Sequence, residues 1–222
     1  MDSEMKTKTI TTTLAASAVF IFLLSASSCS QKQNSPEHSE HGEKEMHEEH
    51  KGLANEFVHS NDIIVLQEQQ AVTDGFSQGI AGFYEQYLLL EDAFVSGDLE
   101  KADSYADAMK LQVLAIDTSG LNGQSLEAWQ NHSDTYNEVL KEMKHIEGLE
   151  EKRGYFAHLS EVMYCTLRSF QLKNIVANAA FCPMAFDKKG AYWLTSTKEI
   201  RNPYLGSEML KCGKIKEEQV GQ

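Results

Sequence analysis

Two cysteine and methionine pairs near the C-terminus carry residue types that bind soft metal ions. Pro183 separates Cys182 from Met184 and fixes the backbone between the two sulfur-bearing side chains. Met209 and Cys212 are three residues apart, so a single helical turn would place both on one face. Thiolate and thioether are ligands that Cu(I) prefers, whereas Mg²⁺ and Ca²⁺ prefer oxygen. If the two pairs meet, they predict a four-sulfur site for Cu(I) or Ag(I).

The same two cysteines are open to other interpretations. A Cys182–Cys212 disulfide would close a loop of about thirty residues and stabilise the fold by roughly 3 to 4 kcal/mol. A redox dithiol is less well supported, because such enzymes usually carry Cys-x-x-Cys. Zinc is a further candidate ion, because two cysteines with histidines form a common zinc ligand set. The residues alone leave these alternatives open.

The remaining sulfur and imidazole groups of the C-terminal half lie in helical patterns. Met163 is near the end where the tail is expected to fold back, so it is a fifth candidate metal ligand. Cys165 lies in an apolar stripe and is predicted to be a small core residue. The histidines at 132, 145 and 158 are predicted to be surface or hydrogen-bonded residues rather than ligands.

The N-terminus has the features of a lipoprotein export signal. Lys6 and Lys8 precede an apolar stretch at 14–24 that is short for a membrane span. Small residues then lead to Cys29, as in the lipobox that signal peptidase cleaves before the cysteine is lipidated. We therefore predict a signal peptide at 1–28 and a lipid anchor at Cys29. The protein is expected in the bacterial cell envelope, periplasmic or surface-facing, at the outer rather than the inner membrane.

Residues 29–55 are predicted to be a flexible tether, because they contain too few apolar residues to fold alone. The tether is rich in glutamate and histidine. Its candidate ligands for weak, accessory metal binding are His38, His41, Met46, His47 and His50. An equally simple interpretation is a solvated spacer that binds no metal.

Composition argues against nucleic acid as a partner. The chain has 33 acidic and 20 basic residues, a net charge of −13, and no long block of lysine and arginine. Once Cys29 carries lipid, three of the four cysteines remain. In an oxidising compartment this count allows one disulfide and a spare thiol, or a metal site.

Four apolar stripes with helical spacing follow the tether. They predict helices over about 76–94, 99–116, 126–143 and 150–178, joined by short polar turns such as Ser96-Gly97-Asp98. We therefore expect an all-α fold, an up-and-down antiparallel four-helix bundle over 56–178. An irregular C-terminal loop segment, 179–222, is expected to pack on it as part of the same domain. No haem, di-iron, nucleophile-elbow or phosphate-loop motif is present, so a protein that is not an enzyme is expected.

The C-terminal segment also resembles a known family. CPMA at 182–185, AYWL at 191–194, EIRNPY at 199–204 and ML.CG at 209–213 are similar to the signature of a bacterial domain-of-unknown-function family. The similarity extends through KRGYFAHLSEVMY at 152–164 and, more loosely, to about residue 76. That family occurs alone in lipoproteins and appended to periplasmic adaptors of Cus-type copper and silver efflux pumps. The tether lies outside the shared pattern.

The resemblance implies a helical bundle associated with heavy-metal handling, and it points to Cys182, Met184, Met209 and Cys212, with Met163 as a further position. The expected function is Cu(I) or Ag(I) binding in copper homeostasis, resistance or efflux, with an efflux adaptor or copper chaperone as partner. The alternative function is a disulfide-stapled helical module that docks on an adaptor or envelope partner without binding metal.

Overall fold

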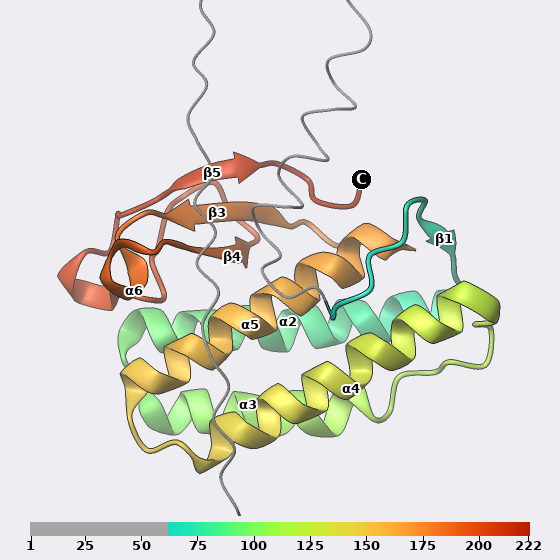
Figure 1. Cartoon of the computed structure of the whole chain (residues 1–222), viewed down its shortest axis with the longest axis horizontal. Coiled ribbons are helices and arrows are strands. Elements are labelled where there is room, and N and C mark those ends of the chain that lie inside the picture. The colour runs from blue at the N-terminus through green and yellow to red at the C-terminus, as the bar shows by residue number, and fades with distance from the viewer. Residues whose placement is uncertain (1–61) are drawn as a thin grey trace, which may run out of the picture. The chain divides into compact units, whose positions relative to one another are not determined.

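The computed structural model describes residues 62–222 of the chain, which are mostly helical with two small sheets (Figure 1). The long helices are α2 (Asp74–Ser96), α3 (Leu99–Val113), α4 (Gly123–His145) and α5 (Leu149–Ser169). The predicted signal peptide, Cys29 and the histidine-rich tether lie outside the described residues, so they stay predictions. Within residues 62–222, no helix combines the length and apolar character needed to cross a bilayer.

The ends of the first two long helices follow from capping residues. The Thr73 hydroxyl accepts a hydrogen bond from the Phe76 amide and starts α2. Gly97 adopts a left-handed conformation, with φ of 71°, and ends the helix. Asp98 then accepts from the Lys101 amide, at 3.0 Å, and starts α3. The stop predicted at Ser96-Gly97-Asp98 is confirmed.

Helices that are consecutive in the chain pack against one another, and their apolar stripes form the core. The predicted stripe of α2 is buried at every position, namely Phe76, Ile80, Phe83, Tyr87, Leu90 and Phe94. Its aromatic rings pack against rings of the other helices. The ring centroids of Phe83 and Tyr136 of α4 are 4.8 Å apart, and those of Tyr87 and Phe156 of α5 are 5.1 Å apart. Hydrophobic burial along these stripes therefore joins the helices.

The predicted C-terminal end of the fourth helix is wrong. Helix α5 ends at Ser169 rather than near residue 178, because Phe170 adopts an extended backbone. Strand β2 (Phe170–Gln171) instead pairs in parallel with β1 (Gln70–Ala71). Val176, which lies inside the range predicted for the helix, is 57% exposed. Pairing with a distant part of the chain, which no local period reports, ends the helix here.

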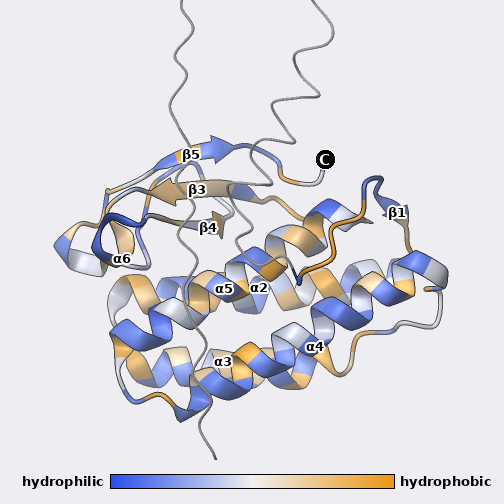
Figure 2. Ribbon diagram, viewed as in Figure 1, coloured by the Kyte–Doolittle hydropathy of each residue, from blue (hydrophilic) through white to orange (hydrophobic). Residues whose placement is uncertain are grey.

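The C-terminal segment is also more regular than predicted. Strands β3 (Asn178–Cys182), β4 (Ala191–Thr195) and β5 (Lys214–Glu217) form an antiparallel sheet in the order β4-β3-β5. The connections contain α6 (Ala185–Lys188) and the 3-10 helix η1 (Gly206–Glu208). Every residue of β4 is buried and the strand contacts α5, whereas Figure 2 shows β5 as largely hydrophilic. The expected irregular loop is therefore a small sheet mounted on the helices.

Residues 62–66, the described part of the segment before the helices, contain no helix or strand. His132 holds this segment: Nε2 lies 2.6 Å from the Ile64 carbonyl oxygen, and Nδ1 lies 3.1 Å from the Thr166 hydroxyl. Burial lowers the pKa of His132 to about 4, so the ring is neutral at physiological pH. His132 is thus a buried, hydrogen-bonded histidine, as its place in a helical stripe predicts.

The Tyr87 hydroxyl joins two helices to the sheet. It lies 2.7 Å from Ser160 Oγ of α5 and accepts a hydrogen bond from the Leu194 amide of β4 at 3.0 Å. The Ser160 hydroxyl donates to the Phe156 carbonyl, so the Tyr87 hydroxyl donates to Ser160. All three polar groups are buried and mutually satisfied.

Replacing Tyr87 by phenylalanine should therefore loosen the sheet from the helices. Tyr87→Phe leaves the buried Leu194 amide without an acceptor, and we expect the free energy of unfolding to fall by about 1 to 3 kcal/mol. Urea denaturation measures this change. The matched control is Tyr105→Phe, at a half-buried position on α3, which should stay within about 0.5 kcal/mol of the parent protein. Equal effects of the two substitutions would contradict the role given to Tyr87.

Candidate functional site

The sheet brings the two cysteines of the predicted site together. Cys182 is the last residue of β3 and is buried, and Cys212 lies two residues before β5 and is partly buried. Because β5 pairs with β3 so that Lys214 lies opposite Phe181, the chain delivers Cys212 beside Cys182. The two sulfur atoms are 2.9 Å apart, and both residues are free thiols.

The Cys212 thiol favours the protonated form. The hydrogen bond with Cys182, together with burial, raises the pKa of Cys212, and a backbone hydrogen bond from Met184 opposes this shift. A second negative charge beside the first would be costly, so both thiols ionise only when something stabilises the charge. A bound cation does this, and disulfide formation removes the protons altogether.

Both methionines are connected to Cys212 through the backbone. The Met184 backbone bonds to the Cys212 sulfur, and the Cys212 amide donates to the Met209 carbonyl at 2.9 Å. Their side chains are 39% and 44% exposed, respectively. The helical turn expected for Met209 and Cys212 is wrong: η1 ends at Glu208, and a single hydrogen-bonded turn follows.

Met163, the fifth predicted ligand, faces the helices. It is fully buried in α5, and its sulfur accepts a hydrogen bond from the Tyr136 hydroxyl of α4 at 3.6 Å. Cys165 is likewise buried in α5, and burial raises its pKa well above that of an ordinary thiol. The structure therefore brings Cys182 and Cys212 together and attaches Met184 and Met209 to them, while Met163 contacts α4.

The backbone after Met184 is strained. Phe186, Asp187 and Lys188 are three consecutive non-glycine residues with φ of 49°, 57° and 70°. A left-handed conformation costs about 1 to 2 kcal/mol per residue, and such strain is concentrated at functional sites. The Phe186 ring packs 5.2 Å from Tyr204, and the Gly190 amide bonds to the Ala185 carbonyl, which together hold the turn. The sequence predicts a turn at Lys188-Lys189-Gly190, but no glycine lies at 186–188, so the left-handed conformation of these three residues was not predicted.

Asn202 positions the segment that carries Cys212. Its side chain is fully buried, donates to the Cys212 carbonyl at 2.7 Å, and accepts from the amides of Tyr204 and Leu205 at 2.8 and 3.0 Å. The sequence indicates only a turn at Asn202-Pro203. Asn202 belongs to the EIRNPY motif at 199–204, which was the sequence signal for this residue. The motif does not show the hydrogen bond from Asn202 to Cys212, because that bond crosses a loop.

Trp193 packs against the segment that carries Cys212. It is buried on β4, and it contacts Gly213, the residue after Cys212. A Cβ at Gly213 would lie 2.8 Å from the Trp193 ring and 3.0 Å from the Phe181 carbonyl, and φ there is 137°. Only glycine fits this position. The close approach keeps the Cys212 segment against the sheet.

The comparison with family models identifies the helical part of the chain. Residues 83–174 match a model described as a protein of unknown function, DUF3347. These residues are similar to that family, and the match covers less than half of the chain. No curated protein and no solved structure matches the chain. The matched DUF3347 residues include most of α2 and all of α3, α4 and α5, while both cysteines of the thiol pair lie after its last matched residue.

Helix α2 contributes a buried carboxyl group at its contact with β4. Burial raises the pKa of Glu91, on α2, to about 8, and Arg201 and the Trp193 and Thr195 side chains oppose the shift. Asp92, beside it in the chain, adds to the shift. The Trp193 indole nitrogen nevertheless has no hydrogen-bond partner of standard geometry. Glu91 is therefore protonated at neutral pH. It lies beside Trp193 and Thr195 of β4.

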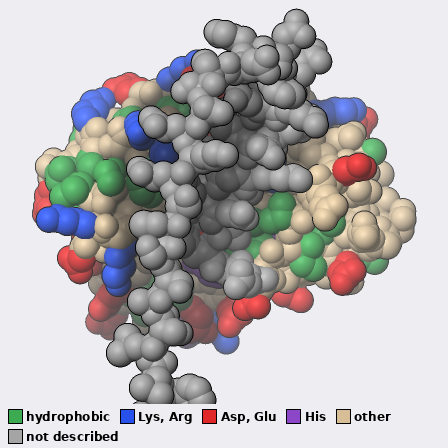
Figure 3. All heavy atoms as spheres, turned by 45° about the horizontal axis from the view of Figure 1, so that its top comes forward, with side chains coloured by type: hydrophobic (Ala, Val, Ile, Leu, Met, Phe, Trp, Pro, Cys, Tyr) green, Lys and Arg blue, Asp and Glu red, His purple; other side chains and the backbone are tan. Residues whose placement is uncertain are grey.

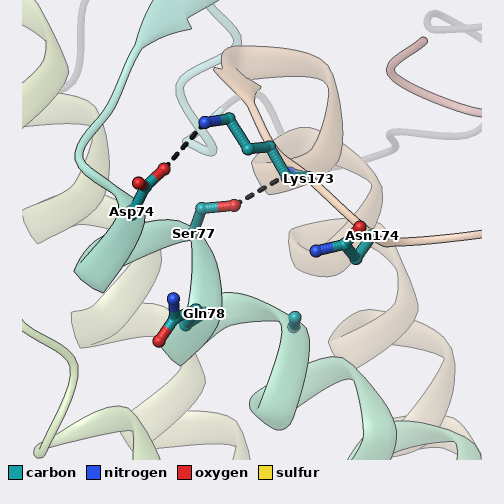
Figure 4. A pocket seen from close by; sticks show the side chains of 6 residues that line it. Asp74, Ser77, Gln78, Lys173 and Asn174 are labelled. Carbon is teal, nitrogen blue, oxygen red and sulfur yellow. Dashed lines mark hydrogen bonds and ion pairs between the residues drawn. The ribbon is translucent and has the colours of Figure 1, made fainter.

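A second group of polar residues lies near the start of α2, in the pocket of Figure 4. Asp74 and Lys173 form an ion pair at 2.7 Å, and the Lys173 amide donates to the Ser77 hydroxyl. These groups satisfy one another and hold the chain after β2 against α2. Across residues 62–222, no three histidine, cysteine, aspartate or glutamate side chains are grouped to hold one metal ion.

Removing the Asn202 side chain should free Cys212 from its position. Asn202→Ala leaves the Cys212 carbonyl and two amides unpaired, so we expect the free energy of unfolding to fall by about 2 to 4 kcal/mol. In a glutathione redox buffer, the equilibrium constant for the Cys182–Cys212 disulfide should fall at least about tenfold. Asn137→Ala, which removes one hydrogen bond on α4, is the control and should leave that constant unchanged. An unchanged constant in Asn202→Ala would contradict a positioning role.

Glu91 should make the protein less stable as the pH rises. The pKa of Glu91 is higher in the folded state than its ordinary value of 4.5, so the folded protein holds a proton that the unfolded chain loses. The contribution of Glu91 to stability is therefore greatest below pH 4.5 and falls by up to about 1.4 kcal/mol per pH unit between pH 4.5 and 8.

Glu91→Gln lacks this loss, so its free energy of unfolding relative to the parent protein should increase from pH 5 to pH 8. Urea denaturation at both pH values measures it. The exposed Glu85→Gln on the same helix serves as control and should follow the parent protein. Parallel pH profiles of the parent protein and Glu91→Gln would show that Glu91 does not titrate in this range.

Proposed function

We propose that this protein is a lipid-anchored protein of the bacterial cell envelope that binds Cu(I), or Ag(I), through Cys182, Met184, Met209 and Cys212. The observation that carries the proposal is the approach of the Cys182 and Cys212 sulfur atoms to 2.9 Å, with both methionines attached to Cys212 by backbone hydrogen bonds. Two thiols and two thioethers are a soft ligand set. The role that follows is copper homeostasis, resistance or efflux, without substrate turnover.

The properties of the thiols agree with a metal ligand set. Cu(I) binds thiolates, so loading of the site releases the thiol protons. The raised pKa of Cys212 keeps the Cys212 thiol protonated at neutral pH, and the affinity for Cu(I) should therefore increase as the pH rises. The exposed thioethers of Met184 and Met209 are accessible from solvent, whereas Cys182 is buried. In this arrangement, the methionines would meet an incoming ion first and the cysteines would retain it.

The same thiols support a second functional state. In an oxidising compartment, Cys182 and Cys212 can lose two protons and two electrons to a disulfide-carrying oxidoreductase and form a bond between their sulfurs. This disulfide would staple the sheet and remove both thiolate ligands. The oxidised protein would then be an interaction module that docks on an efflux adaptor or envelope partner, and the reduced protein would bind metal.

The cellular setting of the proposal rests on the sequence. The predicted export signal and lipid anchor at Cys29 place the protein in the envelope, and the C-terminal signature resembles the family of lipoproteins and Cus-type adaptors. The DUF3347 match supports a family of unknown function. We propose that its helices form an up-and-down four-helix bundle that carries the metal site, with His38, His41, Met46, His47 and His50 as a weak metal collector and Met163 as a core residue of the helices.

An anaerobic Cu(I) titration against a competing chelator tests this function. The reduced full-length protein in detergent should bind one equivalent tightly. Cys182→Ser should weaken binding at least about a hundredfold and Met209→Leu about tenfold, because each removes one sulfur ligand. Cys165→Ser and Met143→Leu remove buried sulfurs of the helices and should leave the affinity within about threefold.

A variant with alanine at His38, His41, His47 and His50 separates the tether from the sulfur site. It should retain the tight equivalent. The metal proposal fails if the reduced protein binds no Cu(I) tightly, or if the tight equivalent disappears in this histidine variant and persists in Cys182→Ser. An intact Cys182–Cys212 disulfide in the purified protein, together with no tight binding after reduction, would favour the stapled interaction module.

A further inference from the structure

The segment that carries the thiol pair has the opposite charge to the rest of the protein. Residues 179–216 contain seven lysine and arginine residues and three acidic ones, whereas the whole chain has a net charge of −13. Three of these basic residues are neutralised by acidic partners: Lys198 by Glu218, Arg201 by Asp92 and Lys211 by Glu199.

Lys188, Lys189 and Lys214 are exposed and form no ion pair with any of residues 62–222. All three lie at the end of the sheet where the thiols are. Lys188 and Lys189 belong to the connection between Cys182 and Ala191, which are paired across β3 and β4. Lys214 pairs with Phe181, the neighbour of Cys182. Their positive charges are therefore available to a binding partner.

Exposed thioethers lie among these charges. Met184 and Met209 are two of the large hydrophobic side chains that remain exposed in the described part of the chain, and both are attached to Cys212. Figure 3 shows hydrophobic side chains bordered by lysine and arginine at the left of the molecule, the end at which α6 lies in Figure 1. We define Met184, Lys188, Lys189, Met209 and Lys214 as the basic end.

We propose that the basic end docks an acidic metal-carrying protein, which exchanges Cu(I) with the Cys182 and Cys212 thiols through its own sulfur ligands. This inference rests on the proposed function and adds the chemical class of the partner. Charge complementarity selects the partner: the rest of the chain has a net negative charge and repels an acidic protein, whereas the basic end attracts it. The attraction therefore also orients the partner toward the thiols.

The exchange is balanced as a ligand substitution. Copper remains Cu(I) throughout, and a bond from a partner sulfur to copper breaks as a bond from Cys182 or Cys212 forms. Each cysteine thiol that becomes a ligand releases its proton to solvent. A thioether that leaves the metal does so as a neutral group and needs no proton. An anionic bilayer would also fit the lysines, but it would cover the thiols without offering a sulfur ligand.

The rate of Cu(I) transfer tests the partner class. The probe is a Cu(I)-loaded synthetic peptide with two methionine ligands flanked by glutamates, and its control carries lysines in place of the glutamates. With the reduced full-length protein at low salt, the acidic donor should transfer Cu(I) at least about tenfold faster than the basic donor. The difference should largely disappear at about 0.5 M salt, because screening removes the attraction.

The matching variant replaces Lys188, Lys189 and Lys214 by glutamine. It should slow transfer from the acidic donor about tenfold, while the equilibrium affinity for Cu(I) stays within about threefold. The control variant replaces Lys101, Lys141 and Lys144, exposed lysines of the helices, and should transfer like the parent protein. Equal rates for the two donors, or equal slowing in the two variants, would overturn the proposal.

The outcomes separate this inference from the proposed function. Absence of tight equilibrium binding refutes the Cu(I) site itself, whereas tight binding with no preference between donors refutes only the acidic partner. Transfer rates of the full-length protein anchored in vesicles show whether the basic end binds a lipid surface instead of a protein. If phosphatidylglycerol vesicles slow transfer relative to phosphatidylcholine vesicles, and the lysine-to-glutamine variant at the basic end removes that slowing, then the bilayer occupies the basic end and the protein partner is refuted.

Discussion

The buried hydroxyl of Tyr87 is the constraint on which the geometry of the thiol pair depends. A tyrosine hydroxyl in the core needs partners, and here they come from α5 and from the backbone of β4. Since Leu194 of β4 is paired with Ala179 of β3, the same contact sets the position of the strand that ends at Cys182. A polar group inside the helical core thus determines where the sheet lies, and the sheet determines where the first sulfur lies.

A second set of buried polar contacts holds the other cysteine. Glu217 of β5 accepts a hydrogen bond from the Tyr164 hydroxyl and pairs with Arg168, both on α5, and Asn202 holds the Cys212 carbonyl. Cys182 therefore ends a strand, β3, that pairs with the attached strand β4, and Cys212 lies two residues before the attached strand β5. Such attachment lowers the entropy lost when both thiols bind one ion or form a disulfide. The strained turn after Met184 lies between these fixed points and is supported by them.

Much of the fold was predictable from local patterns. The stripe from Phe76 to Phe94 and the stop at Gly97 depend on side-chain period and on the left-handed conformation, and the structure has both. The end of α5 at Ser169 was not predictable in this way, because Phe170 leaves the helix to pair with Gln70, a hundred residues earlier. The sheet was missed for a different reason. Strand β4 is buried at every residue, so it lacks the alternation of apolar and polar residues that identifies a strand in a sequence.

The sequence alone determined which residue types can act, namely the cysteines at 182 and 212 with a methionine close to each, and it determined the helices that form the core. Only the tertiary structure decided that the two thiols meet, that Met163 faces α4, and that Asn202 and Gly213 hold the Cys212 segment. The tertiary structure also collected the unpaired lysines at one end of the sheet. The physical reason is range: helical period and capping act within a few residues, whereas strand pairing and buried hydrogen bonds join residues that the sequence keeps far apart.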